Sequence, residues 1–263
     1  MTEINAVVLA GDSKKGAVQE GIDNKSLLPI NGKPMVEYVI DALRDSPLVD
    51  KISIIGPTLP LKEHLGDKVD YYIESRDSLF ENVKAGLEPF ANDKAVLVVT
   101  SDIPMITGEM VTDFIQKSMN LGCDFCYPIV EKQLNEKRFP GVERTYVRLK
   151  DGTYTGGNII FLNPSVVGPC EEFARKLIEF RKQPWKTSRM LGLKFLVGLL
   201  LGSLSIPEVE ERFCRLLDIK ASAIVVSYPE IGNDVDKPSD VEMVKRYFNS
   251  MQNQTANKMK NNI

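Results

Sequence analysis

Histidine is almost missing from this chain, and its scarcity limits the chemistry that the protein can perform. The only histidine, His64, falls in the segment LKEHLGD, which we expect to be a surface loop. A histidine-rich metal site and a Ser-His-Asp hydrolase are therefore disfavoured, because both rely on histidine side chains placed inside a site. Any reaction is expected to depend on aspartate, lysine and backbone groups.

Cysteine is scarce as well. The four cysteines, Cys123, Cys126, Cys170 and Cys214, are too few for a disulfide framework in 263 residues. Cys123 and Cys126 form a C-x-x-C pair, which is best explained as two small apolar residues at the start of a strand, since no second ligand pair for zinc is visible. The opening MTEINAVVLAG has no basic leader, so we expect no signal peptide and a location in the reducing cytoplasm.

An excess of one charge and a membrane-spanning apolar run are also absent. The 33 basic and 36 acidic residues leave a net charge of −3, which gives no electrostatic case for nucleic-acid binding. The most apolar stretch, 190–204, is shorter than the roughly 20 residues that cross a bilayer, and Lys194 interrupts it. A hydrophobic fraction of 43% excludes a mainly disordered chain.

The first half of the chain alternates apolar runs with helical patterns. Alternating units of this kind predict a parallel-type sheet with helices on both faces, and ligands that bind beyond the carboxyl ends of the strands. The run AVLVVT lacks polar alternation, which is typical of a strand buried on both faces. The expected strands cover 4–10, 51–56, 69–73 and 95–100, and the expected helices cover 35–43, 79–87 and 108–119.

The pattern changes after about residue 120. Runs at 123–130, 144–150 and 156–162 are expected to extend the sheet without long helices between them. Residues 164–218 have helical spacing, and the capping box that begins at Ser205 predicts the start of a second helix in a helical hairpin. A final strand is expected over 222–227, and the polar composition of 251–263 predicts a disordered tail.

Two glycine-containing loops near the N-terminus could bind phosphate. The first, Leu9-Ala10-Gly11-Asp12-Ser13-Lys14-Lys15-Gly16, leaves the first strand, where glycines let backbone N–H groups approach phosphate oxygens. In the second, Lys25 precedes an apolar run and a Gly-Lys-Pro turn, and could present its ammonium group to a triphosphate. A solvated surface lysine is the alternative interpretation of Lys25.

Aspartates follow two of the expected strands. Asp102 comes directly after 95–100, where the ligand crevice should lie, and a carboxylate there suits Mg²⁺. Asp234 and Asp236 alternate on an extended segment and should project to the same side, so that one of them could supply a second carboxylate. Turn capping by Asp102 and helix capping by Asp236 or Ser239 remain the structural alternatives.

Taken together, these segments resemble the MobA-like NTP transferases of the nucleotidyltransferase superfamily. The segments that carry the resemblance are VVLAG (7–11), 25–43, VVTSDIP (98–104), TGGNIIFLNP (155–164) and DVDKPSDVEMV (234–244). The resemblance implies a single Rossmann-like, GT-A-type α/β/α domain of three layers over 1–250, with a mostly parallel mixed sheet and a helical insertion at about 164–220.

The resemblance also implies roles for individual residues. It assigns phosphate contact to Lys25 and divalent-metal binding to Asp102 and Asp236. Where many members of the family carry Gly-x-Arg, this chain has Asp12, and Lys14 or Lys15 would replace the arginine. The other implied positions are Leu9, Ala10 and Gly11 for nucleotide backbone contacts, Arg76 and Ser78 for the base, and Gly156, Gly157 and Asn158 for the acceptor.

The function that the resemblance implies is Mg²⁺-dependent transfer of an NMP group from an NTP to a phosphorylated acceptor, with release of pyrophosphate. A GT-A-type glycosyltransferase is one alternative, although Asp102 is followed by Ile103-Pro104 and not by a second acidic residue. A nucleotide-binding regulatory module without catalysis is the other alternative. It is favoured by Asp12 and by the missing arginine.

The helical insertion could help to choose the acceptor or a partner. Basic residues beside an apolar helix can bind an anionic membrane surface, so that 175–204 could contact a membrane peripherally and serve a lipid-linked acceptor. Packing of the hairpin on the sheet, or on a second subunit of a homodimer, is the alternative. The basic residues in question are Arg175, Lys176, Arg181, Lys182, Lys186, Arg189 and Lys194.

Overall fold

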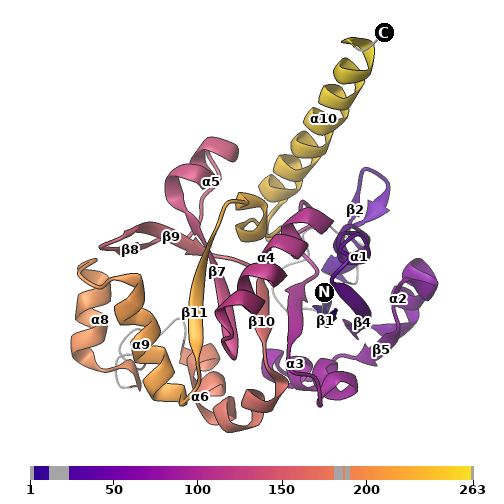
Figure 1. The fold of residues 1–263 in the computed structure, drawn as a ribbon. Coiled ribbons are helices and arrows are strands. Elements are labelled where there is room, and N and C mark those ends of the chain that lie inside the picture. The colour runs from indigo at the N-terminus through magenta and orange to yellow at the C-terminus, as the bar shows by residue number, and fades with distance from the viewer. Residues whose placement is uncertain (1–2, 12–23, 181–185, 187–189, 262–263) are drawn as a thin grey trace.

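The fold is a central mixed sheet with helices packed on both faces (Figure 1). The computed structural model describes residues 3–11, 24–180, 186 and 190–261. Over these residues the main sheet has nine strands in the order β5-β4-β1-β6-β10-β7-β9-β8, and β11 pairs with β7. The predicted three-layer Rossmann-like class is confirmed.

The parallel half of the sheet comes from the first hundred residues. It contains β1 (Ile4–Leu9), β4 (Val49–Gly56), β5 (Tyr71–Glu74) and β6 (Val96–Thr100). Both β4 and β6 run parallel to β1, with Val7 opposite Ser53 on one side and Val98 on the other. Alternate residues of β1 and β6 are buried on opposite faces, which explains why the sequences of these two strands show no polar alternation.

The other half of the sheet reverses direction at β10 (Ile159–Leu162), which is antiparallel to both β6 and β7 (Phe125–Glu131). A hairpin of β8 (Val147–Leu149) and β9 (Gly152–Gly156) continues from β7. The last strand, β11 (Ala221–Val226), returns parallel to β7. The sequence pattern missed β9, because its short run GTYTG lies between the two runs predicted at 144–150 and 156–162.

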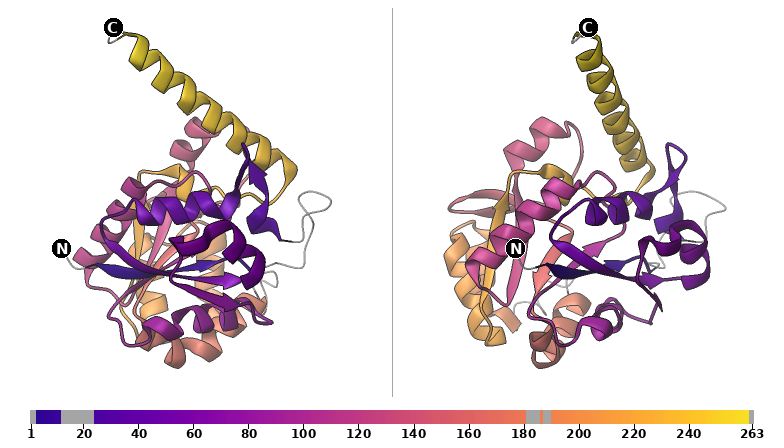
Figure 2. Two further views of the ribbon diagram at one scale, coloured as in Figure 1. Left: turned by 90° about the vertical axis from the view of Figure 1, so that its right-hand side faces the viewer. Right: turned by 45° about the vertical axis from the view of Figure 1, so that its right-hand side comes forward.

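Helices α1 (Met35–Arg44) and α4 (Gly108–Leu121) cover one face, and α3 (Leu79–Leu87) and α6 (Val167–Phe180) cover the other (Figure 2). Each face has its own apolar core, and β1 contributes Val8 to the first and Val7 to the second. Packing on both faces keeps the sheet rigid, and the predicted site residues Lys25, Asp102 and Asp236 lie on the segments at its carboxyl edge.

Two short helices were missed by the sequence patterns. Helix α2 (Thr58–Leu65) contains His64, so the expected loop is wrong, although His64 is exposed as expected. Helix α5 (Lys132–Arg138) follows β7 directly. Both are about two turns long, so that few apolar positions repeat, and α2 buries only Leu61 and Leu65. A second, two-stranded sheet pairs β2 (Pro29–Ile30) with β3 (Lys33–Pro34).

The chain between β10 and β11 contains α6 and two further described helices, α8 (Leu193–Leu200) and α9 (Ile206–Leu217). Ser205 and Glu208 form the capping box that begins α9. Phe195 of α8 packs edge-to-face on Phe213 of α9, with ring centroids 6.4 Å apart. In the part of the chain that is described, no helix combines the length and apolar character needed to cross a bilayer.

Helix α10 (Pro238–Asn261) projects from the body of the molecule (Figure 2). The predicted disordered tail is therefore corrected, because the backbone is helical as far as Asn261. The first turns of α10 are anchored by Met243, Val244 and Tyr247 in an apolar cluster. An anchored helix propagates readily through residues of good helix propensity such as Met, Gln, Ala and Lys, even where the composition is polar.

Close packing of α3 on the sheet gives a test of the fold. A Cβ at Gly86 would lie 2.3 Å from Ile55 Cδ1 and 2.5 Å from Val7 Cγ1. We expect Gly86→Ala to lower the free energy of unfolding by about 1–3 kcal/mol, because overpacking outweighs the gain in helix propensity. Urea denaturation measures the change.

Gly168 on α6 is the matched control, because a Cβ there meets nothing within 4 Å. Gly168→Ala should leave the free energy of unfolding unchanged or raise it by up to about 1 kcal/mol. Equal effects of the two substitutions would contradict the close approach of α3 to the sheet.

Candidate active site

Three segments far apart in the sequence meet beyond the carboxyl ends of β1 and β6. Lys25 begins the short 3₁₀ helix η1 (Lys25–Leu27), Asp102 follows β6, and Asp236 precedes α10. The ammonium nitrogen of Lys25 lies 2.8 Å from Asp102 Oδ2 and 2.6 Å from Asp236 Oδ1. The structure thus brings together the three side chains that the sequence analysis singled out.

A backbone hydrogen bond joins two of these segments. The Val235 N–H donates to the Asp102 carbonyl over 2.9 Å. The Val235 side chain is fully buried in a cluster that also contains Leu28 and Met105, which lie close in sequence to Lys25 and Asp102. One apolar cluster therefore holds all three site segments in register.

Asp234 adds a third carboxylate to the site. One oxygen atom from each of Asp102, Asp234 and Asp236 lies within 4.8 Å of the other two, which makes these residues the one group of potential metal ligands among the described residues. Asp234 and Asp236 project to the same side, as their alternation predicts.

This set of donors fits a divalent cation of the Mg²⁺ type. Such ions prefer carboxylate oxygens. Asp102 Oδ1 is buried and has no hydrogen-bond partner among the described residues, so it is available to a ligand. Cys123 and Cys126 belong to no such group in the described part of the chain.

Burial and charge alter the titration of these groups. Burial by itself would lower the pKa of Lys25, but the carboxylates of Asp102 and Asp236 more than offset it and raise that pKa above its ordinary value. Burial would raise the pKa of Asp236, yet its hydrogen bond to Lys25 holds the pKa low. Asp234 has no such bond to Lys25, and burial together with the charges of Asp102 and Asp236 raises its pKa to about 6.

The buried Asp240 and the partly buried Arg144 position the segment that carries Asp234 and Asp236. Asp240 Oδ2 accepts hydrogen bonds from the backbone N–H groups of Asp236 and Lys237, at 3.0 and 3.1 Å. Arg144 donates to the Asp234 carbonyl over 2.8 Å and to Asn233 Oδ1 over 3.1 Å.

Sequence reasoning missed both positioning residues. Asp240 is recognisable only as a candidate capping residue of the final helix, and Arg144 lies in an irregular loop that has no periodic pattern. No signal in the chain links Arg144 to a segment about ninety residues later.

The expected nucleotide loop is only partly described. Lys14 and Lys15, together with Asp12, lie outside the described residues. Ala10 donates its N–H to Ile55 and accepts a hydrogen bond from the Asn24 side chain at 3.0 Å, and the Leu9 carbonyl accepts from the Ser101 N–H. Ala10 and the Leu9 carbonyl therefore serve the sheet and η1, and nucleotide contact by the backbone of this loop stays a prediction.

The expected base-reading segment is close to this loop. Ser78 caps α3 by accepting from the Glu81 N–H, so its hydroxyl has a structural task. The Arg76 N–H donates to Asn82 Oδ1, and the Asn82 amide nitrogen would lie 3.1 Å from a Cβ at Gly11. Asn82, which sequence analysis missed, thus connects Gly11 to Arg76.

The expected acceptor segment is a tight bend between β9 and β10. A Cβ at Gly156 would lie 2.2 Å from the Tyr127 hydroxyl, and a Cβ at Gly157 would lie 2.7 Å from Ile231 Cγ2. Both glycines are required by close packing. The Asn158 carbonyl accepts from the Thr100 N–H at 3.1 Å, which ties the bend to the end of β6 near Asp102. An acceptor role for this bend stays a prediction.

Comparison with known families agrees with this geometry. A mixed α/β sheet with acidic groups at its carboxyl edge is typical of the nucleotidyltransferase class of enzymes. The family model of the MobA-like NTP transferase domain matches residues 6–179, which is more than half of the chain. The chain therefore belongs to the MobA-like NTP transferase family, and the resemblance inferred from its motifs is confirmed.

Curated relatives match parts of the chain. The bifunctional protein GlmU of Bacillus subtilis (strain 168) is 31% identical over 115 residues, which are 43% of this chain and 25% of GlmU. The 2-C-methyl-D-erythritol 4-phosphate cytidylyltransferase of Clostridium botulinum (strain Eklund 17B / Type B) is 29% identical over 126 residues, or 45% of this chain and 55% of that enzyme. The chain thus spans about a quarter and about half of the lengths of these two relatives.

Solved structures extend the likeness over most of the chain. A hypothetical transferase from Thermus thermophilus is 38% identical, with a TM-score of 0.82, and the match covers 91% of this chain and 100% of that chain. A CMP:2-keto-3-deoxy-manno-octonic acid synthetase in complex with CTP has a TM-score of 0.60 at 14% identity, covering 95% and 100% of the two chains. At that identity the second likeness shows the fold alone.

The raised pKa of Asp234 predicts a dependence of stability on pH. A carboxyl whose pKa rises from 3.8 to about 6 on folding contributes stability below the unfolded value, and that contribution is lost as the pH rises through about 6. Asparagine resembles the protonated form and carries no charge. Without divalent ions, Asp234→Asn should exceed the natural chain by about 1–2 kcal/mol in unfolding free energy at pH 7.5, after allowance for solvent screening.

At pH 4 the natural chain and the Asp234→Asn variant should be equally stable, because Asp234 is then protonated in the folded protein. Urea denaturation at both pH values measures the difference, and Asp113→Asn on the surface of α4 is the control. A difference between Asp234→Asn and the natural chain that is the same at both pH values would refute the titration of Asp234 near pH 6.

Proposed function

We propose that this protein transfers an NMP group from an NTP to a phosphorylated acceptor and releases pyrophosphate. The observation that carries the proposal is the contact of Lys25 with both Asp102 and Asp236 at the carboxyl edge of the sheet. A cation between two carboxylates, next to a third, suits a site where triphosphate charge and metal charge must be balanced. The cytoplasm, which supplies NTP and Mg²⁺, is the compartment that we propose.

Asp102 and Asp236, with Asp234 beside them, would hold Mg²⁺, which when bound neutralises negative charge on the phosphates. Lys25 would exchange its carboxylate partners for phosphate oxygens of the NTP and offset the charge that develops on the leaving pyrophosphate. Among the remaining cations, Lys14 and Lys15 are assigned the same task by the family pattern alone.

The reaction itself needs little covalent help from the protein. A phosphate oxygen of the acceptor forms a bond to the α-phosphorus of the NTP, and the bond from that phosphorus to the bridging oxygen breaks as pyrophosphate leaves. Catalysis of this kind depends on holding the two reactants in line and on stabilising charge. The rigid sheet edge and the bend at Gly156, Gly157 and Asn158 supply fixed positions for the two reactants.

A phosphorylated acceptor is supported by the relative whose name states its substrate, the 2-C-methyl-D-erythritol 4-phosphate cytidylyltransferase. We propose that the acceptor is a small phosphorylated molecule, a class that extends to lipid-linked phosphates. Incubation with each of the four NTPs and Mg²⁺, read as thermal stabilisation, identifies the nucleotide first. Release of pyrophosphate, and not of a nucleoside diphosphate, then separates nucleotidyl transfer from glycosyl transfer. Stabilisation by an NTP without any turnover would favour a regulatory module.

Asp102 gives the sharpest test of the proposed reaction. Asp102→Asn keeps the shape of the side chain but removes its charge, so we expect Mg²⁺-dependent pyrophosphate release to fall at least about a hundredfold. Asp113→Asn, whose aspartate pairs with Lys117 on the outer surface of α4, should retain full activity. Full activity of the Asp102→Asn protein would refute the metal role of this carboxylate.

A further inference from the structure

The outer face of α8 exposes large aliphatic side chains. Leu193, Val197, Leu200 and Leu201 are 69%, 45%, 74% and 71% exposed. Their spacing places them on one side of the helix, since residues four and seven or eight positions apart lie above one another. Contiguous exposed apolar patches commonly mark sites that bind another protein, a membrane or a ligand. We call these four residues the α8 face.

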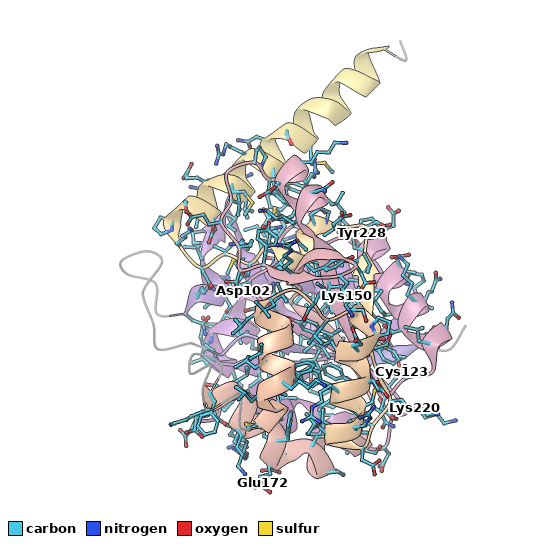
Figure 3. All side chains as sticks on the ribbon, turned by 90° about the vertical axis from the view of Figure 1, so that its left-hand side faces the viewer. Asp102, Cys123, Lys150, Glu172, Lys220 and Tyr228 are labelled. Carbon is cyan, nitrogen blue, oxygen red and sulfur yellow. The ribbon has the colours of Figure 1, made fainter. Side chains whose placement is uncertain are left out.

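The opposite side of α8 is packed against the protein. Phe195 contacts Phe213 of α9, and a Cβ at Gly198 would lie 3.0 Å from Leu204. The helix also lies against β8. The orientation of α8 is therefore fixed by its inner side, and the α8 face stays exposed after the hairpin has packed. Figure 3 views the molecule from the side on which α8 and α9 lie, so that these helices are in front of the sheet.

Two basic side chains flank the α8 face. Lys194 lies on α8, and the stem of Arg148 packs over Gly202 just beyond the C-terminal end of the helix, where a Cβ would lie 2.8 Å from Arg148 Cγ. Both residues are exposed, and neither forms an ion pair with a described carboxylate. Three further basic residues lie between the start of α6 and α8 in the described part of the chain, and each has a partner. Arg175 and Lys176 pair with glutamates, and Lys186 lies over the Phe180 ring.

Asp151, just after β8, and Glu208, in the first turn of α9, already accept hydrogen bonds. Glu208 accepts hydrogen bonds from the Ser205 N–H and from Lys150, and Asp151 accepts from the Ile206 N–H. The α8 face is thus an apolar patch flanked by two exposed basic side chains, Lys194 and Arg148. A partner with the complementary chemistry is apolar inside and negative at its surface.

We propose that the α8 face docks on an anionic lipid bilayer. Three aliphatic side chains on a helix of eight residues, with Leu201 at its C-cap, suit shallow insertion at the interface, and the flanking cations suit anionic headgroups. A second copy of the chain fits less well, because a standard interface engages about 20–30 residues of each partner. The proposal needs no nucleotide, so it is tested separately from nucleotidyl transfer.

Co-sedimentation with vesicles tests the proposal on the full chain. The natural protein should pellet with vesicles made of equal parts phosphatidylglycerol and phosphatidylcholine, and less with pure phosphatidylcholine. The triple variant Leu193→Gln, Leu200→Gln and Leu201→Gln should lose at least about tenfold in partition coefficient, because it removes the inserted apolar area. Leu59→Gln on α2 is the control, since Leu59 is also exposed, at 72%, but stands apart from the α8 face.

The double variant Lys194→Gln and Arg148→Gln tests the contribution of charge. Its partition coefficient should fall about fivefold per charge removed, and only with anionic vesicles at low salt.

The thermal melts of all variants should match that of the natural protein, because the replaced side chains are on the surface. If the natural protein does not pellet, or if the triple variant pellets equally well, the proposal is overturned. A dimer of the natural protein that the triple variant dissociates, without vesicle binding, would assign the α8 face to a second copy instead.

Discussion

The hydrogen bond from the Val235 N–H to the Asp102 carbonyl is the contact on which the rest of the site depends. It joins the end of β6 to the segment before α10 and so sets the separation of three carboxylates. The buried Val235 side chain holds the same place from the apolar side. Like charges at this distance repel, and Lys25 together with the neighbouring Arg144 offsets the repulsion. The local backbone is thus organised around charges that would otherwise separate.

Much of this arrangement could be predicted from the chain alone. Continuous apolar runs identified β1 and β6 because burial on both faces leaves no polar alternation, and Asp102 followed from its position after such a strand. The alternation of Asp234 and Asp236 placed both on one side of an extended segment. These inferences succeeded because each depends on a pattern that is local in sequence.

The contributions of Arg144 and Asn82 could not be predicted, because each depends on contacts between segments whose pairing no short pattern records. Helices α2 and α5 were missed since two turns contain too few apolar repeats. The helical backbone of 251–261 was not predicted, because a polar composition indicates that a segment buries little apolar surface. It does not indicate whether a helix that is anchored elsewhere continues through the segment. The roles of the glycine bend remain predictions, since close packing already explains both glycines.

The site is assembled from distant parts of the chain, and this has a consequence for biogenesis. The hydrogen bond from Lys25 to Asp236 joins residues 211 positions apart, and the family match ends at residue 179, before either Asp234 or Asp236. On the ribosome, the first crossover and β6 emerge many seconds before the segment that completes the carboxylate set, at about 5–20 residues per second. The three carboxylates therefore come together only after the segment before α10 has been synthesised, and termination before Asp234 yields a product that keeps Asp102 but lacks the other two.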